Sequence, residues 1–184
     1  RARGKKRVAV GRDCRLTSDS YAAALRQGLR STGVDVVDIG TCPTPLLYFA
    51  LHHYDLDGGI QVTGSHNPSD YNGFKICIGK ITIHGEEIQE LRKLIEQGTF
   101  TAGQGQEQSA SIIPPYQEFV IKQFGRLERK INVVIDAGNS TAGPVAPFGP
   151  VVSILLVAPA SSGAAPGSPL PLRSSPQAGS AQLA

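Results

Sequence analysis

The stretch that decides the fold is residues 60–76, which read IQVTGSHNPSDYNGFKI. Apolar residues with period two, bounded by Gly and Pro, predict strands at 59–62 and 74–78. The polar segment between them is too long for a tight hairpin turn. Polar loops at the end of a buried strand commonly carry binding and catalytic groups, so this loop is the first candidate for a functional site.

The chain before this stretch alternates strands with helices. A strand is predicted at 8–10, and Ser18 is predicted to cap a helix that Gly33 ends. A second strand at 34–39 is followed by a helix that Pro43 and Pro45 open and that runs to about residue 53. This order predicts parallel strands joined by helical crossovers.

The chain after the loop adds a hairpin and another helix. Gly79 and Lys80 form a turn that joins strands at 74–78 and 81–83, and a helix with an apolar face begins at Glu86. We therefore expect an α/β fold with a doubly wound, mostly parallel sheet and an antiparallel edge strand. Residues 98–111 have little apolar content and are interpreted as a surface connection.

The remaining residues suggest two further parts. A helix at 115–124 and a strand at 131–135, which ends in the Gly-rich segment 136–143, restart the strand-then-helix order as a second α/β domain would. We therefore divide the chain into a first domain at 1–111, the start of a second at 112–143, and a tail at 144–184.

The tail has an unusual composition. It contains eight of the thirteen prolines, and Arg173 is its only charged residue. We expect it to lack regular structure and interpret it as a break in the coding frame or a misassembled end. The chain also contains no Met, so we expect that Arg1 is not the native first residue.

Composition argues against several classes of protein, among them nucleic-acid-binding and membrane-spanning proteins. The net charge is +3, and the basic residues are scattered, which argues against a nucleic-acid or membrane-surface partner. Cys14, Cys42 and Cys77 have no metal-ligand spacing and are interpreted as buried reduced thiols, as in a cytoplasmic protein. No apolar stretch is long enough for a signal peptide or a membrane span.

Ser65 is the candidate nucleophile, because it follows the third strand directly. A serine hydroxyl is weak until a base, a metal or a cationic site assists it, and Lys75 at the start of the next strand can be directed back toward it. The alternative is that Ser-His-Asn-Pro is only a hydrogen-bonded turn. A serine hydrolase is disfavoured, because the G-x-S-x-G pattern is absent and adjacent Ser65 and His66 point to opposite sides of an extended chain.

Three segments together resemble one family. The loop VTGSHNPSDYNGFK resembles the phosphoserine loop of the α-phosphohexomutases, whose pattern is T-[AG]-S-H-N-P followed by N-G-x-K. Residues 11–15, GRDCR, and 43–45, PTP, are similar to two further segments of that family. The residues around Ser65 are more similar to the bacterial phosphomannomutase/phosphoglucomutase branch than to the phosphoglucosamine mutases.

The resemblance implies a phosphoryl relay. Phosphorylated Ser65 would donate its phosphoryl group to a hexose 1- or 6-phosphate of mannose or glucose, and the resulting hexose 1,6-bisphosphate would return the other phosphate. The resemblance further implies that Mg²⁺ binds the phosphate of Ser65, that Lys75 acts as acid or base, and that His66 and Asn67 orient the loop and substrate. Arg15 either supports the phosphate or forms an ion pair with Asp13 or another neighbour.

Other segments of that family do not occur in this sequence. They are the metal loop D-G-D-x-D-R with its Asp ligands, the sugar-reading G-E-x-S-G-H and the phosphate clamp R-x-S-G-T. We therefore expect the chain alone to have little or no mutase activity. The alternative is a noncatalytic α/β module that binds a phosphosugar or a protein.

Overall fold

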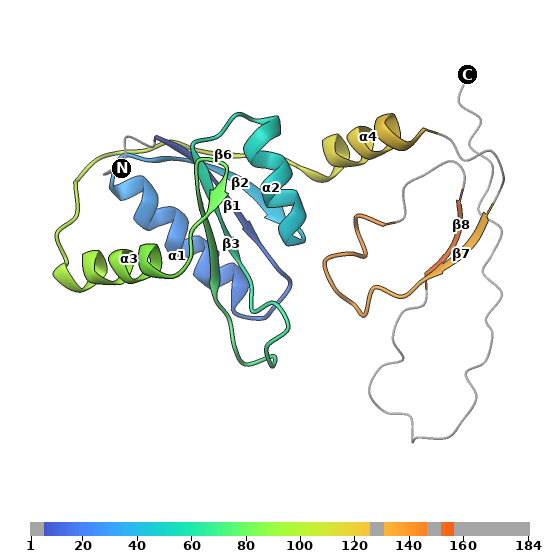
Figure 1. The fold of residues 1–184 in the computed structure, drawn as a ribbon, viewed down its shortest axis with the longest axis horizontal. Coiled ribbons are helices and arrows are strands. Elements are labelled where there is room, and N and C mark those ends of the chain that lie inside the picture. Colours follow the sequence, from blue (N-terminus) through green and yellow to red (C-terminus); the bar gives the residue numbers. More distant parts are fainter. Residues whose placement is uncertain (1–5, 126–130, 147–151, 157–184) are drawn as a thin grey trace.

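A six-stranded mixed sheet forms the centre of the fold (Figure 1). The structure is a computed structural model that describes residues 6–125, 131–146 and 152–156. Its helices are α1 (Ser18–Ser31), α2 (Thr44–His53), α3 (Glu86–Gln97) and α4 (Ile113–Phe124). Its strands are β1 (Arg7–Arg12), β2 (Asp35–Thr41), β3 (Gly58–Val62), β4 (Phe74–Ile78), β5 (Ile81–Thr82), β6 (Glu107–Ser109), β7 (Ile131–Ile135) and β8 (Val152–Leu156).

The strand order of the sheet is β5-β4-β3-β1-β2-β6. Strands β3, β1, β2 and β6 are parallel to one another, and β4 and β5 are antiparallel. This arrangement confirms the α/β sheet with an antiparallel edge that the hairpin pattern predicts. It also places β3, the strand that leads into the polar loop, where parallel pairing changes to antiparallel pairing.

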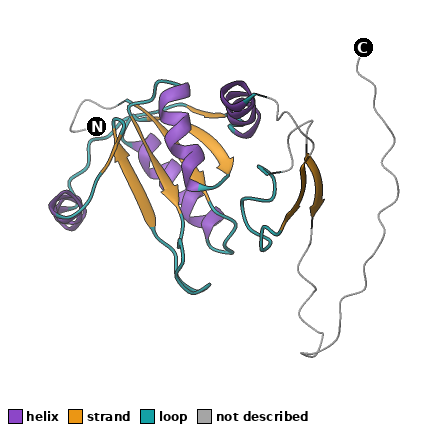
Figure 2. Ribbon diagram, turned by 45° about the vertical axis from the view of Figure 1, so that its right-hand side comes forward, coloured by secondary structure: helices purple, strands orange, loops and turns teal. Residues whose placement is uncertain are grey.

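Helices cover both faces of the sheet, as Figure 2 shows. Alternate residues of a strand point to opposite faces, so neighbouring residues of β1 belong to different cores. Ala9 packs with residues of α2, including Leu46 and Leu47, whereas Val10 packs with Ala22 of α1. None of the helices among the described residues is long and apolar enough to cross a membrane.

The segment 98–111, interpreted from sequence as a surface connection, contains the edge strand β6. Its three residues are exposed and polar, so the sequence carried no strand signal. The segment is nevertheless closely packed, because a Cβ added to Gly105 would lie 2.0 Å from the carbonyl oxygen of Val34. β6 pairs in parallel with β2, and the interpretation as a simple connection was wrong for these residues.

Helix α1 differs from its prediction at the first turn. Thr17 is the N-cap residue, and neither its side chain nor that of Ser18 makes a capping hydrogen bond to the helix. The Ser18 hydroxyl instead donates to the carboxylate of Asp13, outside the helix. At the other end, Gly33 has a φ of 78°, so the predicted role of this glycine at the helix end is confirmed.

A two-stranded parallel sheet follows the first unit. β7 matches the predicted strand at 131–135, and it pairs with β8, which lies inside the segment predicted to lack regular structure. That prediction was wrong for residues 152–156. Residues 147–151 and 157–184 of the predicted tail lie outside the described residues.

Candidate functional site

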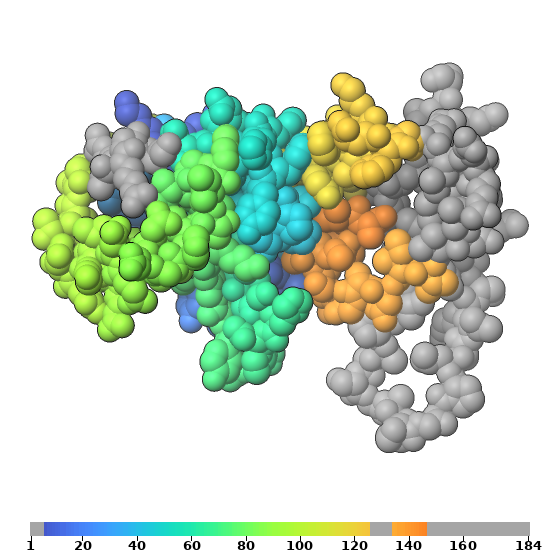
Figure 3. All heavy atoms as spheres, viewed as in Figure 1, coloured from blue at the N-terminus to red at the C-terminus, as the bar shows by residue number. Residues whose placement is uncertain are grey.

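Three polar loops meet at the carboxyl edge of the parallel strands. They follow β1, β2 and β3, and backbone hydrogen bonds hold them side by side. The Asp13 N–H donates to the Val62 carbonyl at 2.9 Å, and the Cys42 N–H donates to the Arg12 carbonyl at 2.9 Å. The loop of residues 63–73, hereafter the Ser65 loop, projects beyond this edge at the bottom of Figures 1 and 3.

Ser65 lies exposed on this loop. Its φ of 52° is left-handed, which is uncommon for a residue other than glycine. The Ser65 N–H donates to Thr63 Oγ1 at 3.0 Å, and the next turn closes through the Asn67 N–H, which donates to the Gly64 carbonyl at 3.0 Å. These bonds hold the backbone of Ser65 in this conformation while its side chain remains accessible to solvent.

Arg15 binds the inner side of the Ser65 loop through four main-chain carbonyls. Its Nη1 donates to the carbonyl oxygens of Pro68 at 2.5 Å and Tyr71 at 3.0 Å. Its Nη2 donates to those of Ser65 at 3.2 Å and Asn67 at 2.7 Å. The guanidinium therefore fixes the loop from one side by contacts with the backbone alone.

The remaining donor of Arg15 points to Asp13, with 3.4 Å between Nε and Oδ2. The ion pair with Asp13, one of the two roles expected for Arg15, is therefore present. A role in binding phosphate stays a prediction, because the Nη atoms already donate to the loop carbonyls.

Asp13 accepts hydrogen bonds from both sides of the site. The N–H groups of Arg15 and Gly64 donate to its carboxylate at 3.0 and 3.2 Å, and the Ser18 hydroxyl donates as well. Burial alone would raise the pKa of Asp13, but these bonds, with a further one from Thr63, hold this pKa below its usual value. The carboxylate is therefore ionised at neutral pH and provides the negative charge opposite Arg15.

Asn72 closes the far end of the Ser65 loop. Its Nδ2 donates to Thr17 Oγ1 and Ser18 Oγ, both at 2.9 Å, and its Oδ1 accepts from the Gly73 N–H at 2.9 Å. The Thr63 N–H then donates to the Gly73 carbonyl at 2.9 Å. Asn72 therefore anchors this end of the loop to the start of α1.

The other predicted site residues lie on or next to this loop. His66 and Asn67 expose their side chains, and Lys75 is half-buried on β4, where it pairs with Gln61 of β3. His66 and Asn67 thus lie within the loop that Arg15 and Asn72 hold in place, whereas Lys75 lies on the strand that follows it. Their roles toward a substrate stay predictions.

A metal site does not follow from the described residues alone. Within residues 6–125, 131–146 and 152–156, no group of three or more His, Cys, Asp and Glu side chains could hold a metal ion. These residues therefore do not fit a self-contained Mg²⁺ site.

The cysteines differ from their prediction at one position. Cys42 and Cys77 are buried free thiols, as expected, but Cys14 is exposed. Burial raises the pKa of Cys42 to about 12. Cys14 lies in the loop after β1, and its Sγ is 3.8 Å from the Asn139 carbonyl oxygen.

Three positions hold the Ser65 loop in a way that was not predicted from the sequence. Asp13 and Asn72 lie inside the quoted patterns GRDCR and N-G-x-K, so the patterns contained the signal that could have found them. Ser18 carried no such signal, because a serine at a helix start is ordinarily interpreted as a cap. Only the tertiary structure shows that its hydroxyl points toward the loop.

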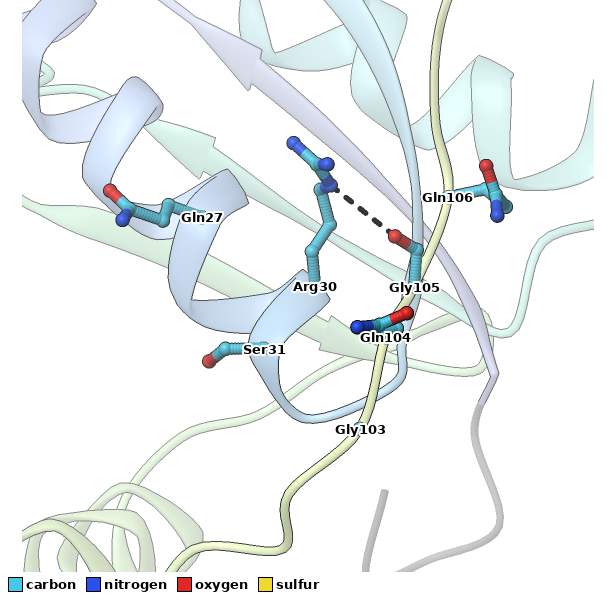
Figure 4. Close-up of a pocket in the computed structure, with 7 residues that line it drawn as sticks. All are labelled: Gln27, Arg30, Ser31, Gly103, Gln104, Gly105 and Gln106. Carbon is cyan, nitrogen blue, oxygen red and sulfur yellow. Dashed lines mark hydrogen bonds between the residues drawn. The ribbon is translucent and has the colours of Figure 1, made fainter.

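A polar hollow of about 750 Å³ lies at the other end of α1, away from the Ser65 loop (Figure 4). Arg30 lines it, but Arg30 Nε donates to the Gly105 carbonyl at 3.3 Å and Nη1 pairs with Glu107 at 3.0 Å. The arginine therefore stabilises the approach to β6, and the hollow does not belong to the site.

Comparisons with known proteins agree with this geometry. Residues 1–102 match the family described as phosphoglucomutase/phosphomannomutase, alpha/beta/alpha domain I. The phosphomannomutase/phosphoglucomutase of Pseudomonas aeruginosa PAO1 is 42% identical over 146 residues, which cover 79% of this chain and 31% of the relative. A phosphoglucomutase of Neisseria gonorrhoeae is 40% identical over 146 residues, covering 78% of this chain and 32% of the relative.

A solved structure gives the same result. The chain matches a phosphoglucomutase/phosphomannomutase family protein of Burkholderia thailandensis with a TM-score of 0.77 and 38% identity, over 85% of this chain and 36% of the other. The chain thus spans about a third of the length of the curated relatives that it matches.

Proposed function

This chain belongs to the phosphoglucomutase/phosphomannomutase family, and from that premise we propose that Ser65 is the phosphoryl carrier of a hexose phosphate mutase. In the first half-reaction the bond between Ser65 Oγ and phosphorus breaks, and a hydroxyl of a hexose monophosphate forms the new bond to phosphorus. The hydroxyl proton passes to a base. In the second half-reaction the other phosphate of the bisphosphorylated sugar returns to Ser65 Oγ.

The observation that carries this proposal is the combination of an exposed Ser65 with a fixed backbone around it. Phosphoryl transfer depends on positioning and on charge stabilisation more than on covalent chemistry by the protein. The Arg15 contacts, the hydrogen bonds of Asp13 and the left-handed φ of Ser65 support this proposal, because they fix the backbone that carries the hydroxyl. Gly64 lies directly against the Arg15 guanidinium.

The other roles follow the family pattern and form part of the proposal. Lys75 is the acid or base at the sugar hydroxyl, and His66 and Asn67 orient the loop and the substrate. The phosphate of Ser65 would be one ligand of Mg²⁺, and further ligands would have to come from outside the described residues; a bound Mg²⁺ would supply charge neutralisation. The substrates are hexose 1- and 6-phosphates of glucose or mannose.

The test is phosphorylation of the 184-residue chain by glucose 1,6-bisphosphate with Mg²⁺, followed by peptide mass spectrometry. We expect one added phosphoryl group, located on Ser65, and none in a Ser65→Ala variant. A Ser69→Ala variant is the matched control, because it removes another exposed hydroxyl from the same loop. Labelling lost equally in both variants, or absent from the parent chain, would instead favour a noncatalytic binding module.

A further inference from the structure

Ser18 is a fully buried polar residue at the start of α1 that the proposed reaction does not use. We propose that Ser18 is a positioning residue for the Ser65 loop. Its hydroxyl on α1 is linked by hydrogen bonds to both ends of that loop. The inference rests on the proposed function only for its consequence in catalysis. The positioning itself follows from the hydrogen bonds that Ser18 makes with Asn72 and Asp13.

The Ser18 hydroxyl joins the two ends of the loop through one atom. At the far end, Asn72 Nδ2 donates to Ser18 Oγ at 2.9 Å. At the near end, Ser18 Oγ donates to Asp13 Oδ1, and Asp13 Oδ2 accepts from the Gly64 N–H at 3.2 Å. Asn72, Ser18, Asp13 and Gly64 therefore form a continuous chain of hydrogen bonds across the base of the loop.

The helix that carries the Ser18 hydroxyl is packed firmly against the sheet. Ser18 is the first residue of α1, and Ala22, one turn further on, is fully buried in the core with Val10 of β1 and Val62 of β3. Val62 is the last residue of β3 before the Ser65 loop. The helix that carries Ser18 and the strand that leads to Ser65 therefore share one packed core, so movement of one relative to the other is restricted.

Loss of the hydroxyl would affect both partners. Asp13 would lose a donor, and Asn72 would lose one of the two acceptors of its Nδ2, although the acceptor Thr17 Oγ1 at 2.9 Å would remain. Hydrogen bonds to ionised groups are stronger than those between neutral groups, so the contact with Asp13 is the stronger of the two. The Gly64 N–H, which precedes Ser65 by one residue, depends on the same carboxylate.

The experiment compares Ser18→Ala with Ser20→Ala in the 184-residue chain. Ser20 is an exposed serine of the same helix whose hydroxyl donates to the Thr17 carbonyl at 2.8 Å and not to the loop. Residue-resolved amide hydrogen exchange is the first measurement. We expect the amides of residues 63–73 to exchange roughly tenfold faster in Ser18→Ala, with β1 unchanged and Ser20→Ala equal to the parent.

A double-mutant cycle distinguishes positioning from a general structural role. Because Ser18 and Asn72 act in one chain of bonds, the effects of Ser18→Ala and Asn72→Ala on exchange at Gly64 should not add. Equal exchange in Ser18→Ala and the parent would overturn the inference, as would additive effects or faster exchange throughout β1.

The phosphoryl transfer proposal is tested separately in the same samples. Where glucose 1,6-bisphosphate labels the parent, we expect slower labelling of Ser65 in Ser18→Ala, by about the factor seen in exchange, and parent-like labelling in Ser20→Ala. An unchanged labelling rate would overturn the link to catalysis. If the parent takes up no phosphoryl group, the proposed function fails, and the exchange comparison still decides whether Ser18 positions the loop.

Discussion

Gly64 occupies the tightest position of the Ser65 loop. A Cβ added there would lie 2.5 Å from Nε and Cζ of Arg15 and 2.8 Å from the Tyr71 carbonyl oxygen. We expect Gly64→Ala to lower the free energy of unfolding by about 1–3 kcal/mol, because the guanidinium must move away from the carbonyls that it binds. Urea denaturation measures this change.

The control for that prediction lies in the same loop. A Cβ added to Gly73 would meet only the Thr63 carbonyl oxygen, at 3.4 Å, so we expect Gly73→Ala to have a smaller effect. Equal losses of stability in the two variants would show that the close approach of Arg15 is not the cause.

Several of these residues could be understood from the sequence and others could not. The exposed Ser65 after β3 and the close approach at Gly64 followed from strand periodicity and glycine placement, which are local properties. The choice between two roles for Arg15 required the fold, because its partners Pro68 and Tyr71 are more than fifty residues away. The role of Ser18 depends on a contact of the same range, with Asn72.

Strand β6 is held at the sheet edge by backbone pairing with β2 and by ion pairs with α1. Its Glu107 pairs with Arg26 at 3.0 Å and with Arg30 at 3.0 Å, both from α1. We expect Glu107→Gln to reduce the free energy of unfolding by about 1 kcal/mol and to increase amide exchange in β6, because Arg26 and Arg30 lose the carboxylate that they share, although Arg26 keeps its ion pair with Asp38. Chemical denaturation and hydrogen exchange measure the two effects.

The matched control removes a more exposed ion pair. Glu96 pairs with Arg92 on α3, where both side chains are more than half exposed. We expect Glu96→Gln to change stability by less than about 0.5 kcal/mol, as is usual for such surface pairs. A loss as large as that of Glu107→Gln would contradict the argument that partial burial strengthens the pairs at β6.

The strands differ in how well the sequence pattern predicted them. The strands β1, β2 and β3 are buried on both faces, so apolar runs predicted them. β6 gave no such signal, because it is short, polar and exposed, whereas the apolar run VSILL of β8 lies in a segment whose proline content argued against regular structure. The pairing of such strands is determined by the neighbouring strand more than by their own residues.

We propose that mutase activity requires groups that this sequence does not contain. The D-G-D-x-D-R and R-x-S-G-T segments are absent from the 184 residues, and the described residues hold no cluster of metal ligands. Removing one positioned donor commonly costs on the order of 10² to 10³ in rate. We therefore expect little or no conversion of glucose 1-phosphate in a coupled mutase assay, whereas turnover close to that of a full-length relative would contradict this expectation.

The fold also has an apolar groove outside the Ser65 loop. It has a volume of about 780 Å³ and lies between α1 and α3 over β3 and β4. Helix α3 buries none of its residues, and Leu94 and Ile95 are at least half exposed. This agrees with the expectation that the first domain leaves apolar surface uncovered when studied alone.

The contacts of Arg15 have one more consequence. This residue recognises the Ser65 loop through peptide carbonyls, which every amino acid possesses, so the path of the loop is largely independent of the side chains at Ser69 and Asp70. Mutations at these two positions can accumulate during evolution without moving the serine. The architecture thus separates the residues that hold the loop from those that are free to diversify.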